Sequence, residues 1–371
     1  MKAVAVVPGT REIQIVDHPV PRLSTPTDVR LRVLEVGVCG TDKEISTFEY
    51  GTPPSGSNYL VLGHESLAEI VEVGPEVSHY RVGDLVVVMV RRPCWDDRCL
   101  PCRSERQDFC TTGGFMERGI KEAHGFMTEF VVEQERYLIP IPRALRQVAV
   151  LIEPLTIAEK ALAQLRQVQQ RLPWSWPSSE RKPNTAAPNA VVLGAGPVGL
   201  LGAMALVAAG FRTYVYSRSR LPNQKAGVAE AIGATYVSSE AESVEQLAKR
   251  VGNIDVVFEA VGSSDIAFEL VKVLGTNGVF IFTGVPRQKA PAPVETDRIM
   301  KNLVLKNQLL LGTVNAGRDT FEAAVQDLER FTQRWPQAVQ SLLTGRYRME
   351  EFRDVVLGRT GGIKEVITVA A

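Results

Sequence analysis

One stretch decides the fold of this chain: Ala190-Val191-Val192-Leu193-Gly194-Ala195-Gly196-Pro197-Val198-Gly199. Its apolar start predicts a buried strand, and the small apolar residues of 198–209 predict the helix that follows. Between strand and helix, the spacing G-x-G-x-x-G is the fingerprint of a dinucleotide-binding turn. The first glycine permits the tight turn, the second admits a pyrophosphate close to the backbone, and the third allows close helix–strand packing. The helix N-terminus would donate N–H groups to the phosphates. A glycine turn without a ligand is the alternative.

The sequence around this stretch alternates between strands and helices. Further strands are expected at 213–217, 255–259 and 278–284, with a helix near 266–273. Such alternation implies a parallel, doubly wound sheet, so the fold class is α/β. A helix over 319–334 and a short β-like tail at 365–369 follow. We therefore expect the nucleotide-binding unit to be inserted, with the tail returning to the first domain.

The first 140 residues have a different, strand-rich texture. Residues 29–36 alternate apolar and polar side chains, and 85–90 form an apolar run after a glycine turn. A helix is expected over 147–172, broken or restarted near Pro154, and the Pro/Ser-rich segment 173–188 reads as a boundary or a functional loop. The predicted domains are 1–187, rich in β-strands, 188–310, which binds the nucleotide, and 311–371, which returns to the first.

Composition excludes several classes of protein. The 371 residues are 45% hydrophobic and 23% charged, which is typical of a globular chain with two cores. Formal net charge is zero, so no bulk electrostatic reason exists to expect nucleic acid or anionic membrane as partner. No apolar stretch approaches the roughly 20 residues of a membrane helix, and the N-terminus reads as a strand and not as a signal peptide. A cytoplasmic location is expected.

Four of the five cysteines form one cluster in the sequence. Cys94, Cys99, Cys102 and Cys110 follow the spacing C-x4-C-x2-C-x7-C. Four thiolates packed so closely are the usual ligands of a closed, structural zinc site, which has no open position for chemistry. Free thiols or disulfides are the alternatives, but clustered cysteines favour metal binding in a reducing compartment.

A second metal site is indicated by residues that follow strand ends. Cys39 follows the strand expected at 29–38, and His64-Glu65 follow residues 60–63. Glu153 lies in an apolar stretch, and a buried acid needs a partner or a metal; capping or pairing at the helix start is its alternative. A lone Cys or His is usually only packed, so the case depends on the combination. Zinc with few protein ligands leaves room for a substrate oxygen and acidifies it, and the Thr41 hydroxyl could then pass on the proton unless it only bonds the local backbone.

The choice between dinucleotides depends on the second strand of the nucleotide unit. No acidic residue occurs between Gly194 and Glu230, although an NAD site usually carries one to bond the ribose 2′-OH. The strand ends instead in Ser217-Arg218-Ser219-Arg220, whose guanidiniums and hydroxyls suit a 2′-phosphate. We expect NADP to be preferred and NAD to be usable, against the alternative of a solvated basic turn.

Taken together, these motifs resemble the zinc-containing medium-chain dehydrogenases. The matching residues are Gly37–Asp42, Gly63–Glu65, Val82–Asp84, the cysteine cluster and the glycine loop. Within that family, the chain is most similar to the archaeal glucose (aldose) 1-dehydrogenases. This likeness is carried by Arg91-Arg92, by Asp108–Gly113 with Glu117 and Gly119-Ile120, by Glu153–Leu155 with Glu159-Lys160, and by Gly312–Asn315.

The resemblance implies a GroES-like catalytic domain with a zinc lobe at about 91–112, a Rossmann domain, one catalytic and one structural zinc, and a homo-tetramer or homo-dimer. It implies oxidation of an aldose, first of all D-glucose, at C1 to the lactone. Another polyol, a secondary alcohol or an amino alcohol is the alternative substrate, and an inactive nucleotide-binding relative is the alternative of another class. Carried over onto this sequence, the catalytic-zinc neighbourhood is Cys39, His64, Glu65 and Glu153, with Glu65 either a ligand or behind one. The substrate would contact Thr41, Glu117, Glu153 and Asn315. The nucleotide would contact residues 194–199, Ser217, Arg218, Ser219, Thr283, Gly284, Val285, Thr313, Val314 and Asn315.

Two departures from the family pattern stand out. Trp95–Arg98 lengthen the start of the cysteine cluster by two residues, which makes Cys94 the least secure of the four ligands. Val90 and Ile157 replace Asn and Asp of some relatives. Losing two polar groups that bond sugar hydroxyls should loosen or change the sugar preference.

Overall fold

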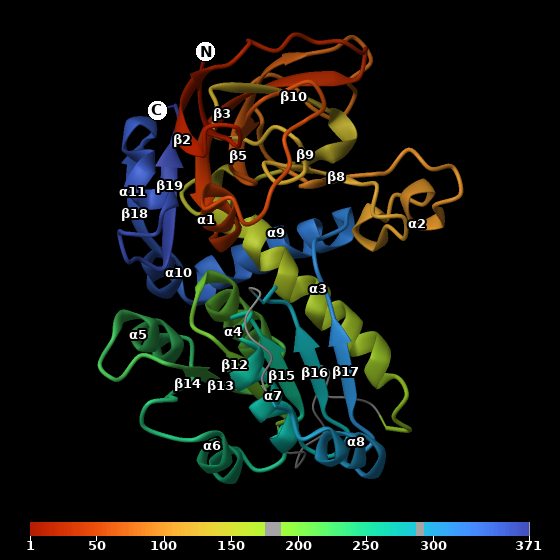
Figure 1. The fold of residues 1–371 in the computed structure, drawn as a ribbon, viewed down its shortest axis with the longest axis vertical. Coiled ribbons are helices and arrows are strands. Elements are labelled where there is room, and N and C mark those ends of the chain that lie inside the picture. Colours follow the sequence, from red (N-terminus) through yellow and green to blue (C-terminus); the bar gives the residue numbers. More distant parts are fainter. Residues whose placement is uncertain (175–186, 287–292, 371) are drawn as a thin grey trace. The chain divides into compact units, whose positions relative to one another are not determined.

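A computed structural model describes residues 1–174, 187–286 and 293–370, and the chain forms two compact units (Figure 1). Unit 1 comprises Met1–Thr156, Asn315–Thr332 and Val339–Ala371, and unit 2 comprises Ile157–Val314 and Gln333–Ala338. The division falls inside helix α3 (Ile152–Gln169), whereas the sequence placed it near residue 187. Most of the predicted connection, 175–186, lies outside the described residues.

Unit 2 is a doubly wound parallel sheet, which confirms the predicted α/β class. Its strand order is β14-β13-β12-β15-β16-β17, and every neighbouring pair is parallel. The order reverses between β12 and β15, the place where open α/β sheets bind ligands. The strands are β12 (Asn189–Leu193), β13 (Arg212–Ser217), β14 (Thr235–Ser238), β15 (Val256–Glu259), β16 (Val279–Phe282) and β17 (Leu309–Gly312). The helices between them are α4 (Pro197–Ala208), α5 (Gln224–Ala231), α6 (Val244–Val251), α7 (Ser264–Val273) and α8 (Thr296–Leu305).

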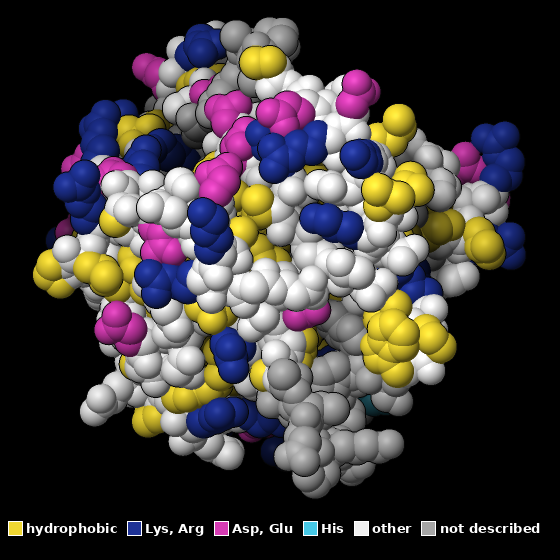
Figure 2. All heavy atoms as spheres, turned by 90° about the horizontal axis from the view of Figure 1, so that it is seen from below, with side chains coloured by type: hydrophobic (Ala, Val, Ile, Leu, Met, Phe, Trp, Pro, Cys, Tyr) yellow, Lys and Arg dark blue, Asp and Glu magenta, His cyan; other side chains and the backbone are white. Residues whose placement is uncertain are grey.

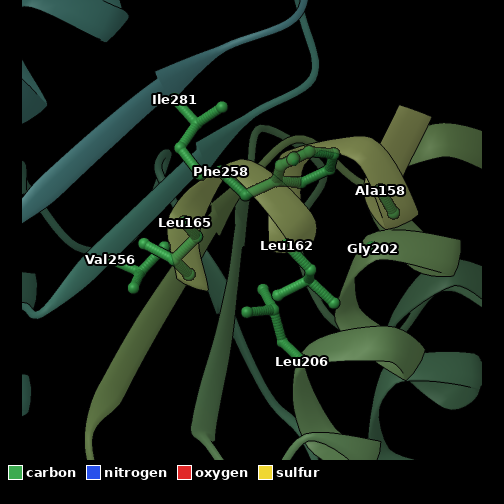
Figure 3. A pocket seen from close by; sticks show the side chains of 9 residues that line it. Ala158, Leu162, Leu165, Gly202, Leu206, Val256, Phe258 and Ile281 are labelled. Atoms are coloured by element: carbon green, nitrogen blue, oxygen red, sulfur yellow. The ribbon is translucent and has the colours of Figure 1, made fainter. Parts of the chain in front are cut away.

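The strands of this sheet are apolar along most of their length. Successive side chains of a strand point to opposite sides, so both faces of the sheet are apolar. Val257 belongs to a buried cluster with Leu247 of α6 and Leu270 of α7. Its neighbours Val256 and Phe258 point the other way, toward α3 and α4. There they line a small apolar pocket of about 10 Å³ with Ile281, Leu206 and Gly202 and four residues of α3 (Figure 3). A gap of that size holds about one water at most, so the pocket belongs to the core.

Unit 1 is built mainly of antiparallel strands. Its largest sheet runs β11-β6-β5-β3-β19-β18, with β10 also paired to β3. Alternate residues of β3, such as Leu31 and Val33, enter a buried core with Ile70 of β5 and Val86 of β6. The strands are β1 (Lys2–Val7), β2 (Glu12–Asp17), β3 (Asp28–Val38), β4 (Leu60–Val61), β5 (Glu65–Val73), β6 (Leu85–Val88), β7 (Arg91–Arg92), β8 (Met116–Arg118), β9 (Glu122–Ala123), β10 (Phe130–Gln134), β11 (Leu138–Pro140), β18 (Leu343–Arg348) and β19 (Lys364–Thr368). The other α-helices of the chain are α1 (Gly40–Ser46), α2 (Leu100–Arg103), α9 (Arg318–Arg334), α10 (Pro336–Leu342) and α11 (Phe352–Val356).

The helix predicted over 147–172 begins later than the sequence suggested. A 3₁₀ turn at Ala149–Leu151 leads into α3, which starts at Ile152. Pro154 therefore lies in the first turn, where a residue without an N–H costs nothing because that donor has no partner within the helix. The proline marks the start of the helix and does not interrupt it.

Among the described residues, no helix combines the length and the apolar character needed to cross a membrane. On the face drawn in Figure 2, Lys and Arg side chains lie interspersed with Asp and Glu side chains.

Candidate active site

The end of β3 brings together residues that are far apart in the sequence. Gly37 of β3 pairs with Glu65 of β5 on one side, and Val38 pairs with Glu365 of β19 on the other. Cys39, which follows β3, therefore lies beside His64, which precedes β5. The antiparallel register alone places these two side chains at one edge of the sheet.

Cys39, His64 and Glu65 form a compact cluster of possible metal ligands. One ligand atom from each lies within 4.8 Å of the other two. The imidazole and the carboxylate are buried, while the thiol is partly exposed. Thr41, in the first turn of α1, places its hydroxyl 3.9 Å from the Cys39 sulfur. Sulfur, nitrogen and oxygen donors in this arrangement fit zinc.

Asp42 organises this cluster, a role that the sequence analysis missed. Its carboxylate accepts the backbone N–H groups of Cys39 at 2.8 Å and Gly63 at 3.2 Å. The same carboxylate lies 3.6 Å from Nδ1 of His64. Burial alone would lower the pKa of His64, but the Asp42 and Cys39 side chains raise it well above 6.5. Asp42 thus orients the imidazole, as carboxylates behind metal-binding histidines do.

Lys364, also missed, neutralises Glu65 in the interior. Its Nζ donates to both Glu65 oxygens at 2.7 and 2.5 Å and to the carbonyl of Val38 at 3.0 Å. Burial lowers the pKa of Lys364, yet Glu65 and Cys39 raise it overall. The pair meets across Gly37, where a Cβ atom would lie 2.1 Å from a Glu65 oxygen. The available signal was a lysine at the start of a strand whose residues are mostly buried.

Glu153 is not a member of the 4.8 Å cluster, although it lies close enough to interact with it electrostatically. Burial, aided by the charges of Glu65 and Asp42, raises its pKa to about 7, against the opposing effects of His64 and Lys364. A carboxyl that takes up a proton near neutrality is poised to bind a metal or a proton. Its role as ligand stays a prediction.

The four clustered cysteines form the second candidate metal site. Their sulfurs all lie within 4.8 Å of one another, and all four thiols are free, so the disulfide alternative is wrong for this structure. The backbone N–H groups of Cys102 and Thr111 lower the pKa of Cys99 to about 6, whereas burial raises that of Cys102. Cys94 joins the cluster despite the insertion, whose Trp95 is 83% exposed. Four convergent sulfurs fit a structural zinc.

The predicted substrate residues Glu117 and Asn315 meet in unit 1. The Asn315 side-chain amide donates to Oε1 of Glu117 at 2.9 Å, and Arg91 donates to the same oxygen. Val90, where some relatives have Asn, is buried in the core of unit 1. Ile157 lies at the start of the part of α3 that belongs to unit 2.

In unit 2, the glycine loop has the geometry that its spacing predicts. Gly194 adopts φ of +107°, and a Cβ on Gly199 would lie 2.2 Å from the carbonyl oxygen of Gly194. Gly196 precedes α4, whose first residue Pro197 has no N–H. No side chain caps this helix end, so the N–H groups of Val198 and Gly199 are available for an anion. Ala195 completes the loop.

The basic turn after β13 has one free and one paired arginine. Ser217 ends the strand, and Arg218 and Ser219 are exposed. Arg220 pairs with Glu240 at 3.1 Å, an acid that the sequence analysis did not connect with this turn. In the part of the chain that the structure describes, no acidic partner engages Arg218, which leaves its guanidinium available.

The ends of β16 and β17 supply the remaining predicted nucleotide contacts. Thr283, Gly284 and Val285 follow β16, and Thr313 and Val314 follow β17. The Thr313 hydroxyl is buried and has no hydrogen-bond partner among the described residues, as expected of a group that meets a ligand. A residue missed by the sequence analysis, Glu259, accepts N–H groups of Gly262 at 2.7 Å and Gly284 at 3.0 Å and so fixes both loops.

The fold, the two cysteine-containing clusters and the glycine loop together place this chain in the class of medium-chain dehydrogenases. Residues 25–143 match the alcohol dehydrogenase GroES-like domain, and residues 146–369 match the family described as glucose dehydrogenase C-terminus. The chain therefore belongs to the glucose dehydrogenase family.

Individual relatives cover the whole chain. A glucose 1-dehydrogenase of Methanocella arvoryzae is 37% identical, with 100% of both chains aligned, and glucose 1-dehydrogenase 2 of Vulcanisaeta moutnovskia is 37% identical over 100% of this chain and 99% of its own. The Haloferax mediterranei glucose dehydrogenase in complex with NADP, Zn and gluconolactone has a TM-score of 0.87 at 33% identity, with 100% of both chains covered. A 2R,3R-butanediol dehydrogenase of Bacillus subtilis, at 23% identity and a TM-score of 0.77, shares the fold.

Proposed function

We propose that this chain oxidises an aldose, D-glucose first of all, at its C1 hydroxyl to the lactone and reduces NADP. The observation that carries the proposal is the Cys39–His64–Glu65 cluster beside the Thr41 hydroxyl, in a chain that matches glucose dehydrogenases along its full length. The sugar loses a hydride from C1 to the nicotinamide and a proton from its hydroxyl to solvent. The relative crystallised with NADP, Zn and gluconolactone supports the same reactants.

The donor set of the cluster suits zinc, which acidifies a hydroxyl when bound. Cys39 and His64 would hold it. Both Glu65 oxygens are engaged by Lys364, which favours Glu153 as the carboxylate ligand and Glu65 as the charge behind it. Thr41 is placed to take the sugar proton, since its hydroxyl accepts and donates.

The nucleotide-binding residues of unit 2 support a preference for NADP, which accepts the hydride on its nicotinamide ring. Residues 194–199 would cradle the pyrophosphate, and Arg218 with Ser217 and Ser219 would bond the 2′-phosphate. Arg218→Ala should therefore raise KM for NADP much more than KM for NAD. Equal changes would show that Arg218 does not read the phosphate.

A substrate panel tests the proposed function. Purified protein loaded with zinc is given glucose, galactose, xylose, sorbitol, threonine or 2-butanol with NADP, and NADPH absorbance is followed. Glucose or another aldose should give the highest kcat/KM. Turnover of only sorbitol, threonine or 2-butanol would replace the aldose by a polyol, amino alcohol or secondary alcohol. No turnover, with one zinc per chain confined to the cysteine cluster, would favour an inactive relative.

Self-association and a cytoplasmic location complete the proposal. Met300, Val304 and Leu305 of α8 are 64–70% exposed, and β17 is the last strand of its sheet. Exposed apolar side chains, together with a strand whose outer side has no partner among the described residues, favour pairing with another copy. Light scattering should then give the mass of a dimer or tetramer. Free thiol clusters fit a reducing compartment.

A further inference from the structure

Two consecutive buried arginines, Arg91 and Arg92, form strand β7, and their side chains leave it on opposite faces. Arg92 pairs with Glu133 at 2.8 Å and lies over the ring of Tyr137. Arg91 pairs with Glu117, its cross-strand neighbour on β8. The two ion pairs are equally buried, but only one of them contains a residue expected to contact the sugar.

The hydrogen bonds of Glu117 are divided unequally between its oxygens. Oε1 accepts hydrogen bonds from Nε of Arg91 at 3.1 Å and from Nδ2 of Asn315 at 2.9 Å, and Nη2 of Arg91 lies 3.0 Å away in the ion pair. Within residues 1–174, 187–286 and 293–370, no hydrogen bond is made to Oε2. These contacts on one oxygen fix the carboxylate plane, because rotating it would break both hydrogen bonds and the close ion pair. The second oxygen keeps its lone pairs for another donor.

Arg91 also connects Glu117 with the cysteine lobe, the segment 94–110. Its Nη1 points to the carbonyl of Asp108 at 3.4 Å, and the side chain of Gln107 points to the Arg91 carbonyl at 3.4 Å. The guanidinium lies 3.7 Å from the ring centre of Phe115, which covers one of its faces. These contacts hold Arg91 against the cysteine lobe.

The same lobe contacts the segment that carries Asn315. Arg106 is held by Asp108 at 3.0 Å and forms an ion pair with Asp319 at 3.3 Å, just after Asn315 in the chain. Asn315 itself has φ of +58°, an uncommon conformation for a residue other than glycine. Its Oδ1 accepts the N–H of Ala316 at 2.8 Å. Its Nδ2, which is a donor only, therefore faces Glu117.

We propose that Arg91 is a positioning residue for sugar recognition: it ties Glu117 to the cysteine lobe and aims the free Oε2 at a hydroxyl of the substrate. This inference rests on the proposed function, because it takes the substrate to be a polyhydroxylated sugar. An Arg suits this task better than a Lys, since its planar fork presents Nε and Nη2 together to one oxygen from a fixed direction. Arg92 makes the matching ion pair away from Glu117 and is a natural control.

The test compares Arg91→Lys with Arg92→Lys in the zinc-loaded enzyme. Both variants keep the charge, and melting temperatures report whether they fold. Arg91→Lys should raise KM for glucose about ten- to hundredfold, the range of a hydrogen bond to a charged group, and leave KM for NADP unchanged. Arg92→Lys should leave both constants within about twofold of the wild type. Equal effects of the two variants on KM for glucose would overturn the inference.

A double variant asks whether Arg91 acts through Glu117. Glu117→Gln alone should raise KM for glucose, and Arg91→Lys added to it should raise KM no further, because coupled residues are not additive. Deoxyglucoses should identify the hydroxyl that Glu117 binds. Removing that hydroxyl should raise KM in the wild type, but it should have little further effect on KM in either single variant. Additive effects would overturn the inference. An enzyme that oxidises glucose but shows no Arg91 effect removes only the inference, while a wild type that oxidises no aldose removes the proposed function with it.

Discussion

The two thiol-containing clusters of unit 1 are held together in different ways. In the cysteine lobe, all four ligands come from one short segment, 94–110, with little regular structure. At the end of β3, Cys39, His64 and Glu65 come from separate segments and are aligned by strand register. In the lobe a metal would hold the chain, whereas at β3 the sheet holds the ligands. Loss of a ligand should therefore affect folding in the first case and chemistry in the second.

The largest effect is expected for Cys39→Ala. Because the sheet and not the thiol positions the cluster, this variant should fold, bind NADPH and keep the lobe zinc. Its kcat should fall by at least about a thousandfold, since a Lewis acid contributes several kcal/mol to such a reaction. Steady-state rates, NADPH fluorescence and zinc content measure these three properties. A Cys39→Ala enzyme with wild-type turnover would contradict the catalytic assignment.

A smaller effect is expected for Lys364→Met, which tests whether Lys364 and Glu65 form a charge pair buried beside the end of β3. Glu65 is 1% exposed and would keep an uncompensated charge, so unfolding should require about 3–5 kcal/mol less. Lys2→Met removes an exposed pair with Glu350 and should leave the denaturation midpoint almost unchanged, because solvent screens such a pair. Chemical denaturation measures both. Adding Glu65→Gln to Lys364→Met should restore part of the lost free energy of unfolding. If nothing is restored, the loss comes from the packing of the lysine side chain and not from the uncompensated charge.

Cys99→Ser tests whether the cysteine lobe contributes to stability more than to turnover. The protein should lose one zinc per chain and about 2 kcal/mol of stability, a fall of roughly 3 °C in melting temperature for a chain of this length. If the lobe positions Glu117 through Arg91, KM for glucose should rise while kcat changes less than in Cys39→Ala. A variant that loses turnover as completely as Cys39→Ala would erase the distinction between the two clusters.

A pH effect is expected at Glu153, beside the β3 cluster, and it changes stability by only a small amount over any single pH unit. In metal-free protein the pKa of Glu153 is raised from 4.5 to about 7. Its contribution to stability is therefore present below pH 4.5 and is lost as pH rises through 7, by up to about tenfold in the folding constant per pH unit. Glu153→Gln should flatten this part of the stability curve, and zinc should do so in the wild type if Glu153 is a ligand. Identical curves for Glu153→Gln and the wild type would contradict the raised pKa of Glu153.

Sequence patterns predicted those parts of the molecule that depend on local spacing. The α/β class followed from the glycine loop and the alternation around it. The four cysteines were proposed from their spacing, and the Cys39–His64–Glu65 group from positions after strands. Lys364 was not, because it meets Glu65 across 299 residues of chain. Asp42 and Glu259 were missed because their roles consist of bonds to backbone N–H groups, which no residue pattern records. The start of α3 was misplaced because a proline in a first turn looks like a helix break.

The position of β19 between two strands of its sheet has a consequence for biosynthesis. The strand lies between β3 and β18, yet it is translated after the whole of 157–314. While a ribosome is still making the inserted unit, β3 has an open side, and Glu65 of β5 lacks its lysine partner. N-terminal segments usually fold first, but here the reactive centre has to wait for residues near 364. A chaperone, or an early partner strand from another nascent chain, would find its target at that exposed edge.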